Sequence, residues 1–215
     1  MPELPTDSIP ALGPDPAAEA APEAAPEMAP EMALEPGPEP DPATDPSAPL
    51  VLTLKLDAST FEQLNDLRQK HFPPERNFLP AHVTLFHALP GDHIDEIRQT
   101  LQYVCAHALA LPLALPELRF LGNGVAIEVH CPELMPIRQM LSEHWHPWLT
   151  NQDRRSLRPH VTIQNKVTSQ EARALYNQML ETWQPLAGQG EGLLLWHYQG
   201  GPWELAGEFL FGQSV

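Results

Sequence analysis

Cysteine and basic residues are scarce in this chain of 215 residues. It has two cysteines, Cys105 and Cys131, too few for a disulfide framework or a zinc site, so we expect two small buried thiols. No uncharged apolar run approaches the roughly 20 residues that span a bilayer. The first residues lack the basic and apolar segments of a secretory signal. We therefore expect a cytoplasmic protein that does not contact a membrane.

The first 49 residues contain no Lys or Arg, but they hold fourteen of the 26 prolines and eleven acidic residues. Proline disrupts helix interiors and central strands, and so little apolar surface cannot offset the entropy of ordering. We expect residues 1–49 to be a disordered acidic Pro/Ala/Glu-rich arm, and residues 50–215 to form the folded domain. Outside the arm, 17 acidic residues face 12 basic ones, which argues against a broad basic face for long duplexes.

The rest of the chain alternates between strand-like and helix-like segments. Apolar runs predict strands, and apolar residues at helical spacing, together with a capping Ser59, predict helices. The expected strands are residues 50–56, 82–89, 111–121, 125–129, 160–164, 193–198 and 204–211. The expected helices follow Ser59 and Pro132 and occupy 92–107 and 169–183. This order predicts an α/β (α+β) fold of two related lobes, about 50–121 and 124–215, joined by a turn at Gly122-Asn123-Gly124.

Two copies of a His-x-Thr motif open the second strand of each half. They are His82-Val83-Thr84 and His160-Val161-Thr162, and a proline precedes each within two residues. Alternation along a strand puts each histidine and its threonine on one face, with Phe86 continuing the first row and Gln164 the second. If the halves pack about a pseudo-twofold axis, both pairs would face one cleft.

This set of side chains suits phosphodiester cleavage. A neutral imidazole takes a proton from the attacking oxygen, and a protonated one donates to the leaving oxygen. Histidine is suited to both roles because its ordinary pKa is about 6.5. The threonine hydroxyls can donate to the non-bridging oxygens. Neither motif has a nearby carboxylate cluster of the kind that Mg²⁺ needs, so we expect no metal and no cofactor.

The segments Arg76–Phe86 (RNFLPAHVTLF) and Arg158–Ile163 (RPHVTI) resemble the paired signatures of the 2H phosphoesterases, particularly the bacterial 2′-5′ RNA ligase branch. The resemblance covers about residues 50–212. It implies a bilobal fold with two mainly antiparallel sheets and flanking helices around a central cleft. It also implies His82, Thr84, His160 and Thr162 as the catalytic set.

The resemblance further implies hydrolysis of 2′,3′-cyclic phosphate ends of RNA or of related nucleotides, with a reversible, ATP-independent 2′-5′ joining reaction. The expected partners are RNA 3′ ends or small cyclic nucleotides, bound by a monomer. The RNA-acting members have more basic character around the cleft than the few cations beside these motifs provide, so nucleotide-sized substrates stay open.

Further candidates surround the motifs. Arg158 and Lys166 can contact a phosphate, although ordinary solvated charge is the simpler interpretation. Phe86, like Phe78, can stack on a base, although core or cleft-wall packing is the simpler interpretation of a phenylalanine. His87 has the opposite strand parity to His82 and is left out of the predicted site.

Two other functions remain open. One is a nucleotide- or RNA-end-binding module with little turnover. The other is an interaction protein whose acidic arm is the functional part. Intact His and Thr in both motifs favour the enzyme.

Overall fold

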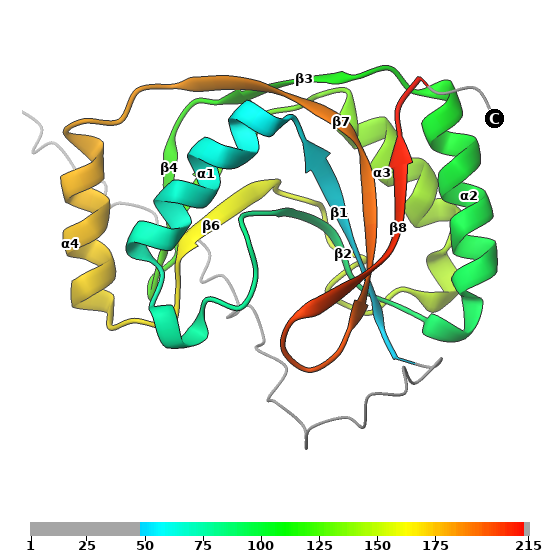
Figure 1. Cartoon of the computed structure of the whole chain (residues 1–215), viewed down its shortest axis with the longest axis horizontal. Helices are drawn as coiled ribbons and strands as arrows, with labels where there is room; N and C mark the ends of the chain where they lie inside the picture. The colour runs from blue at the N-terminus through cyan, green and yellow to red at the C-terminus, as the bar shows by residue number, and fades with distance from the viewer. Residues whose placement is uncertain (1–47, 213–215) are drawn as a thin grey trace, which may run out of the picture. The chain divides into compact units, whose positions relative to one another are not determined.

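The structure, a computed structural model, describes residues 48–212 (Figure 1). The interpretation of residues 1–49 as an arm lies outside the described residues, apart from Ala48 and Pro49. Within the described part, the order of helices and strands follows the sequence prediction closely, and the predicted arrangement of two antiparallel sheets with helices is confirmed. No helix among residues 48–212 is long and apolar enough to cross a membrane.

The larger sheet has five antiparallel strands, with β2, β1, β7 and β3 in spatial order and β8 also paired with β7. Its strands are β1 (Leu50–Leu56), β2 (Val83–Leu89), β3 (Leu111–Leu115), β7 (Leu186–Tyr198) and β8 (Trp203–Leu210). The long strand β7 pairs with β1 on one side, while β3 and β8 share its other side. The hairpin predicted around Gly200-Gly201-Pro202 is confirmed, because β7 and β8 pair across it.

The smaller sheet has three antiparallel strands in the order β4-β5-β6. They are β4 (Leu118–Phe120), β5 (Val125–Glu128) and β6 (His160–Gln164). The prediction of a single strand over 111–121 was wrong, because the chain leaves the larger sheet at Leu115 and enters the smaller one at Leu118. The predicted turn between β4 and β5 is present. Gly124 is required there, since a Cβ would lie 2.1 Å from the carbonyl oxygen of Gln164.

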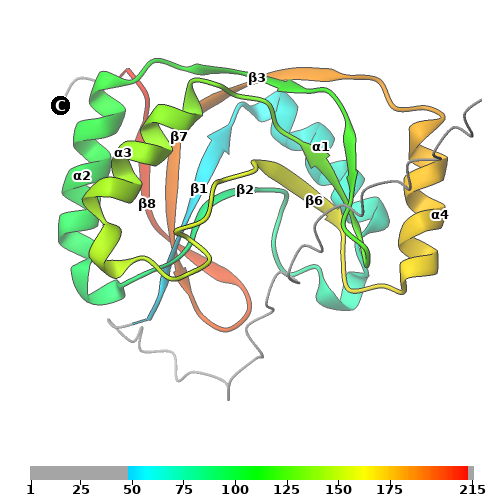
Figure 2. The ribbon, with the colours of Figure 1, turned by 180° about the vertical axis from the view of Figure 1, so that it is seen from behind.

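Two helices lie beside each sheet (Figure 2). They are α1 (Ala58–His71), α2 (Ile94–His107), α3 (Leu134–His144) and α4 (Ser169–Leu180), with short 3₁₀ turns at Pro74–Arg76, Gly91–His93 and His146–Trp148. Asp57, rather than Ser59, caps α1 by accepting the amide of Thr60 at 3.0 Å. Helices α2 and α3 accompany the larger sheet, and α1 and α4 the smaller one.

The sheets do not follow the two halves of the sequence. β7 and β8, from the second half, complete the sheet of β1, β2 and β3, and β4 from the first half joins β5 and β6. The helices also pack across the two halves of the sequence, because α1 of the first half contacts β6 of the second half. The repeat is thus one of element order, and the lobe boundary suggested near residue 122 does not separate the two sheets.

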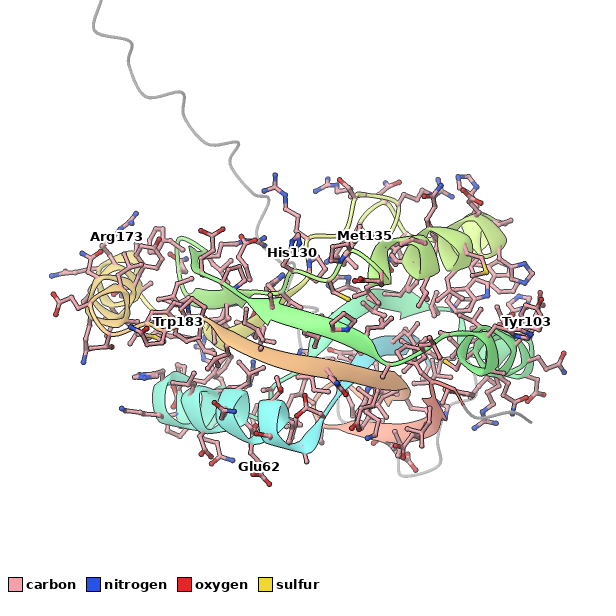
Figure 3. The ribbon with its side chains drawn as sticks, turned by 90° about the horizontal axis from the view of Figure 1, so that it is seen from above. Glu62, Tyr103, His130, Met135, Arg173 and Trp183 are labelled. Carbon is pink, nitrogen blue, oxygen red and sulfur yellow. The ribbon has the colours of Figure 1, made fainter. Side chains whose placement is uncertain are left out.

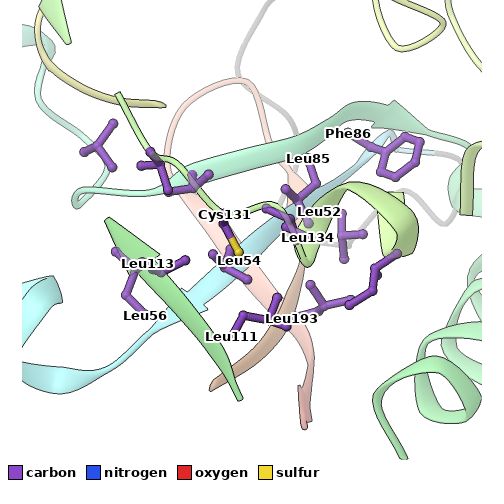
Figure 4. Packing of buried hydrophobic residues seen from close by; sticks show 14 of the residues in the cluster. Leu52, Leu54, Leu56, Leu85, Phe86, Leu111, Leu113, Cys131, Leu134 and Leu193 are labelled. Carbon is purple, nitrogen blue, oxygen red and sulfur yellow. The ribbon is translucent and has the colours of Figure 1, made fainter. Parts of the chain in front are cut away.

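Buried leucine, isoleucine and valine side chains form the core between sheets and helices. Figure 4 shows Leu52, Leu54 and Leu193 of the larger sheet converging with Leu134 of α3 around Cys131. Cys105 and Cys131 are unbridged and buried, as predicted. The two motif strands occupy special places around this core. β2 is an edge strand of the larger sheet, β6 is an edge strand of the smaller one, and the two are in contact.

Candidate active site

The first motif begins just before β2, where the backbone holds its histidine by a short local contact. The ring nitrogen Nδ1 of His82 lies 2.7 Å from the carbonyl oxygen of Pro80. A carbonyl oxygen only accepts, so Nδ1 carries the proton and donates it. Helix α1 supports this segment, because Asn65 accepts the amide of Ala81 at 3.0 Å. Nε2 of His82 is therefore the nitrogen that titrates.

The second motif repeats this arrangement at the start of β6. Nδ1 of His160 lies 2.8 Å from the carbonyl oxygen of Arg158, again two residues earlier in the chain. Both imidazoles are thus fixed in the same tautomer by the same kind of backbone contact. Nε2 is the titrating nitrogen in each, as required for a pair that passes protons to and from a substrate.

The two histidines lie within electrostatic reach of each other. Burial lowers the pKa of His82 to about 4, and the positive charges of Arg68, His160 and His87 lower it further, while the contact with the Pro80 carbonyl opposes the shift. His82 is consequently neutral near pH 7.

The threonines follow their histidines on partly exposed positions. Thr84 stands opposite Thr53 of β1, and Thr162 stands opposite Ala126 of β5. Both motif threonines are half-buried. Strand alternation keeps each hydroxyl on the side of its own histidine.

A β-bulge follows the threonine in both motif strands. In β2, Thr84 pairs with Thr53 but Phe86 pairs with Leu52, so two residues of β2 advance for one of β1. In β6, Thr162 pairs with Ala126 and Gln164 with Val125, which is the same irregularity. Bulges commonly redirect side chains near functional sites.

The bulge overturns the prediction that Phe86 lines the site. Its side chain is 0% exposed, lies edge-on to Trp145 at 5.2 Å, and packs under the guanidinium of Arg138. Gln164 at the corresponding position is also buried. Simple alternation failed at both positions because the extra residue turns the side chain away from the face of the motif.

His87, which strand parity had excluded, lies near the first motif. Its charge contributes to the lowered pKa of His82. Its Nδ1 lies 3.0 Å from the buried carboxylate of Asp153, which also accepts the amides of His87 and Ala88. No local pattern in the sequence signals this pairing, because Asp153 is 66 residues away.

An aromatic wall that the sequence analysis missed stands over His82. The ring of Trp203, at the start of β8, lies 4.9 Å from the imidazole at an angle of 51°. Trp196 of β7 is 6.1 Å from Trp203 and donates its indole N–H to Thr53 at 2.9 Å. The indole N–H of Trp203 is buried and has no acceptor among the described residues.

Arg119 of β4 is a second residue that the sequence analysis missed. It stands opposite Ala126, which in turn stands opposite Thr162, so the three side chains share one row of the smaller sheet. Its Nε donates to the carboxylate of Glu128, while Nη1 is buried and has no hydrogen-bond partner within residues 48–212. A cation is therefore placed beside the second motif.

Arg158 and Lys166 were the other predicted substrate contacts. Arg158 is exposed two residues before His160, and Lys166 is exposed in the turn after β6, with a φ of 61°.

A cavity of about 490 Å³ lies elsewhere, between α1 and the end of α4, with Leu67, Lys70 and Trp183 in its lining. None of the motif residues lines that cavity, so a cleft at the motifs stays a prediction. Within the described part of the chain, no group of three or more His, Cys, Asp or Glu is placed to hold a metal.

Comparisons with known proteins identify one family model and several solved structures of similar fold. The family model of the 2′-5′ RNA ligase superfamily matches residues 56–202. TT0787 of Thermus thermophilus has a TM-score of 0.53 at 13% identity, over 78% of this chain and 100% of that one. LigT of E. coli in its apo form has 0.52 at 17%, and its complex with 3′-AMP has 0.51 at 18%; each covers 78% of this chain and 99% of LigT. At these identities the likeness shows the fold alone. No curated protein matches the chain.

Proposed function

The chain belongs to the 2′-5′ RNA ligase superfamily, and we propose that it is a metal-independent phosphodiesterase that opens 2′,3′-cyclic phosphates on RNA ends or nucleotides. The observation that carries the proposal is the matched anchoring of His82 and His160 by backbone carbonyls two residues earlier. Two imidazoles in one tautomer, within electrostatic reach of each other, form an acid–base pair.

The low pKa of His82 favours one division of labour. His82 is neutral near pH 7, so its Nε2 accepts a proton from the attacking water. His160, in its protonated form, donates a proton to the ribose oxygen that leaves phosphorus. One P–O bond forms and one breaks, and the pair returns to its starting state by exchanging a proton with solvent. In the joining reaction the two roles are reversed.

The threonine hydroxyls and the guanidinium of Arg119 are suited to stabilise the negative charge that develops on the phosphate. Thr84 and Thr162 donate to the two non-bridging oxygens, where negative charge accumulates in the transition state. Arg119 adds a guanidinium beside Thr162, and a guanidinium binds phosphate oxygens by charge-assisted hydrogen bonds. The donors are thus supplied by both motif strands.

The aromatic wall supports a nucleotide-sized substrate. Trp203 presents its indole ring beside His82, and Trp196 lies next to Trp203. Aromatic rings stack on bases with little sequence preference. The E. coli LigT structures that resemble this fold include complexes with 3′-AMP and with NADP⁺. A single nucleotide or an RNA end fits these features better than a long duplex does.

Turnover in EDTA tests the proposal. The substrates are a 2′,3′-cyclic nucleotide and a short RNA with a cyclic phosphate end, given to the wild type and to His82→Ala and His160→Ala. We expect wild-type turnover to survive EDTA and to fall by at least about 10²-fold in each variant. His144→Ala, at an exposed position on α3, is the matched control. Wild-type binding without turnover would instead indicate a nucleotide- or RNA-end-binding module.

Deleting residues 1–47 separates the enzyme from an interaction protein. The deletion keeps Pro49, whose carbonyl accepts the amide of Tyr198 at 2.9 Å. If the chain acts as an enzyme, the deletion should leave kcat and KM unchanged. If the acidic arm is the functional part, the deletion should abolish partner binding.

A further inference from the structure

β2 and β6 carry the two motifs on the edges of different sheets. In the described part of the chain, β2 pairs only with β1, and β6 pairs only with β5. The two strands touch each other without a shared ladder. The spacing of the histidines therefore depends on interactions other than backbone pairing.

Arg68 of α1 spans this junction from one side. Its Nε donates to the carbonyl of Leu79, just before the first motif, at 3.0 Å. Its Nη1 donates to the carbonyl of Thr162, in the second motif, at 2.6 Å. The side chain is 5% exposed, and its guanidinium lies 4.1 Å from the ring centre of Phe72.

Arg138 of α3 spans the junction from the other side. Its Nε donates to the carbonyl of Leu85, directly after the first motif, at 2.8 Å. Its Nη2 donates to the carbonyl of Asp153, in the segment that leads to the second motif. It is also 5% exposed, and it lies 3.7 Å from the ring centre of Phe86.

The two contacts are reciprocal. Arg68 comes from the first half of the sequence and reaches the second motif, whereas Arg138 comes from the second half and reaches the first. The carbonyls that they bind across the halves belong to Thr162 and Leu85, which lie where each motif strand bulges. A bulge interrupts the regular ladder, and a side-chain donor can compensate there.

We propose that Arg68 and Arg138 are a pair of positioning residues that fix the two His-x-Thr strands relative to each other; this inference rests on the proposed function. Each guanidinium joins both motif segments, so that the sheets cannot separate or slide without breaking charge-assisted hydrogen bonds. The planar fork of arginine suits this role, since one side chain reaches two carbonyls in fixed directions.

Burial of two arginines supports a specific role. Desolvation lowers the pKa of Arg138, and the nearby Asp153 opposes the shift. A buried cation is costly and is retained only with good partners. Arg68 is held by the carbonyls of Leu79 and Thr162, by the side-chain oxygen of Asn77 at 2.9 Å and by the ring of Phe72. Arg138 is held by the carbonyls of Leu85 and Asp153 and by the ring of Phe86.

Kinetic analysis of Arg68→Met and Arg138→Met is the first part of the test. We expect kcat to fall by about 10²-fold with a much smaller change in KM, because a displacement of about 1 Å has this effect on reacting groups. Arg68→Lys and Arg138→Lys should lose about 10-fold, since an ammonium lacks the fork. Arg173→Met is the control. Arg173 is an exposed arginine on α4 (Figure 3) that covers the ring of Phe120 of β4 at 3.5 Å.

The second part measures the coupling of the histidines directly, without turnover. The charged groups that act on His82 are Arg68 from α1, His87 from β2 and His160 from β6. NMR titration should show that His160→Ala raises the pKa of His82 in the wild-type background, because a positive charge is lost. In the Arg138→Met background this rise should shrink, because the two strands are no longer held together.

The outcomes separate the two proposals. A coupling that is unchanged in folded Arg68→Met and Arg138→Met proteins overturns the positioning role, whatever their turnover. If a Met variant does not fold, as its thermal transition will show, the Lys variant is titrated in its place, and an unchanged coupling there has the same meaning. A wild type that turns over neither substrate contradicts the proposed function, while the titration still decides the role of the arginines.

Discussion

The imidazole of His82 packs against the indole of Trp203, with ring centres 4.9 Å apart and ring planes inclined by 51°. Trp203 belongs to β8, far along the chain from the motif, and it is brought to His82 by the β7–β8 hairpin. The indole excludes water from one side of the imidazole. This contact connects the aromatic wall with the low pKa of His82, the proposed base.

Replacing Trp203 with leucine should therefore change both the pH dependence and the binding of nucleotides. Exposure of His82 to water raises its pKa toward the ordinary value of about 6.5, so the acidic limb of kcat/KM moves to higher pH. Loss of a stacking surface should also weaken nucleotide binding by about 10-fold. Trp183→Leu, beyond the end of α4, is the control. A pH profile identical to that of the wild type would show that Trp203 does not shield the base.

The pH dependence of the wild type is a separate prediction. A neutral base is required, and burial lowers the pKa of His82 to about 4, so kcat/KM should hold through about pH 5 and fall as the pH approaches 4. An acidic limb between about pH 6 and 7, the range of an ordinary histidine, would contradict this assignment of the base. The measurement is kcat/KM for a 2′,3′-cyclic nucleotide from about pH 3.5 to 8.

Folding stability should respond to the same shift. The unfolded chain takes up a proton on His82 near pH 6.5, whereas the folded protein resists it down to about 4. The unfolded state therefore binds more protons across this window, and the free energy of unfolding falls as the pH falls. The change between about pH 7 and pH 5, measured by urea denaturation, should be smaller in His82→Gln than in the wild type. An equal change in both proteins would show that His82 does not titrate abnormally.

Elements set by local sequence were predicted well. The strands at 50–56 and 160–164 begin and end as expected, and the turn at Gly122-Asn123-Gly124 is present. These predictions depend on apolar patterns or turn residues that lie within a few positions of one another in the sequence. The cap of α1 was misplaced by two residues, because Asp57 and Ser59 are both acceptable capping residues in sequence. The carboxylate of Asp57 also accepts the amide of Gln189 at 2.6 Å, and this long-range contact favours Asp57 as the cap.

Features that depend on strand pairing were not predicted. The bulge that buries Phe86 is defined only relative to β1. Arg119 lies beside Thr162 through two cross-strand pairs. A side-chain period of two predicts faces correctly only while the ladder is regular. The motif residues themselves were accessible from sequence because they occur twice at equivalent places.

The motif threonines should contribute through their hydroxyls. Thr84→Val and Thr162→Val keep the shape and remove one donor each, so kcat should fall by about 10²-fold with little change in KM. Thr100→Val on α2 is the control, since its hydroxyl donates to the carbonyl of Glu96 on an exposed face. Thr→Ser at either motif should retain most of the activity. If Val and Ser variants lost activity equally, packing rather than hydrogen bonding would account for the effect.

Arg119 offers the sharpest distinction between binding and catalysis. Arg119 lies in the row of Thr162, and its Nη1 lacks a partner among residues 48–212. We expect the guanidinium to reorient toward a substrate phosphate bound at the second motif. Arg119→Met should weaken binding of a nucleotide 2′- or 3′-phosphate by about 10-fold or more, as for loss of a charge-assisted hydrogen bond. Isothermal titration of the wild type, Arg119→Met and Arg173→Met measures this directly. Glu128→Gln complements the test: it removes the charge that neutralises the guanidinium, so the same phosphate should bind more tightly. Equal affinities in all four proteins would assign Arg119 to the ion pair with Glu128 alone.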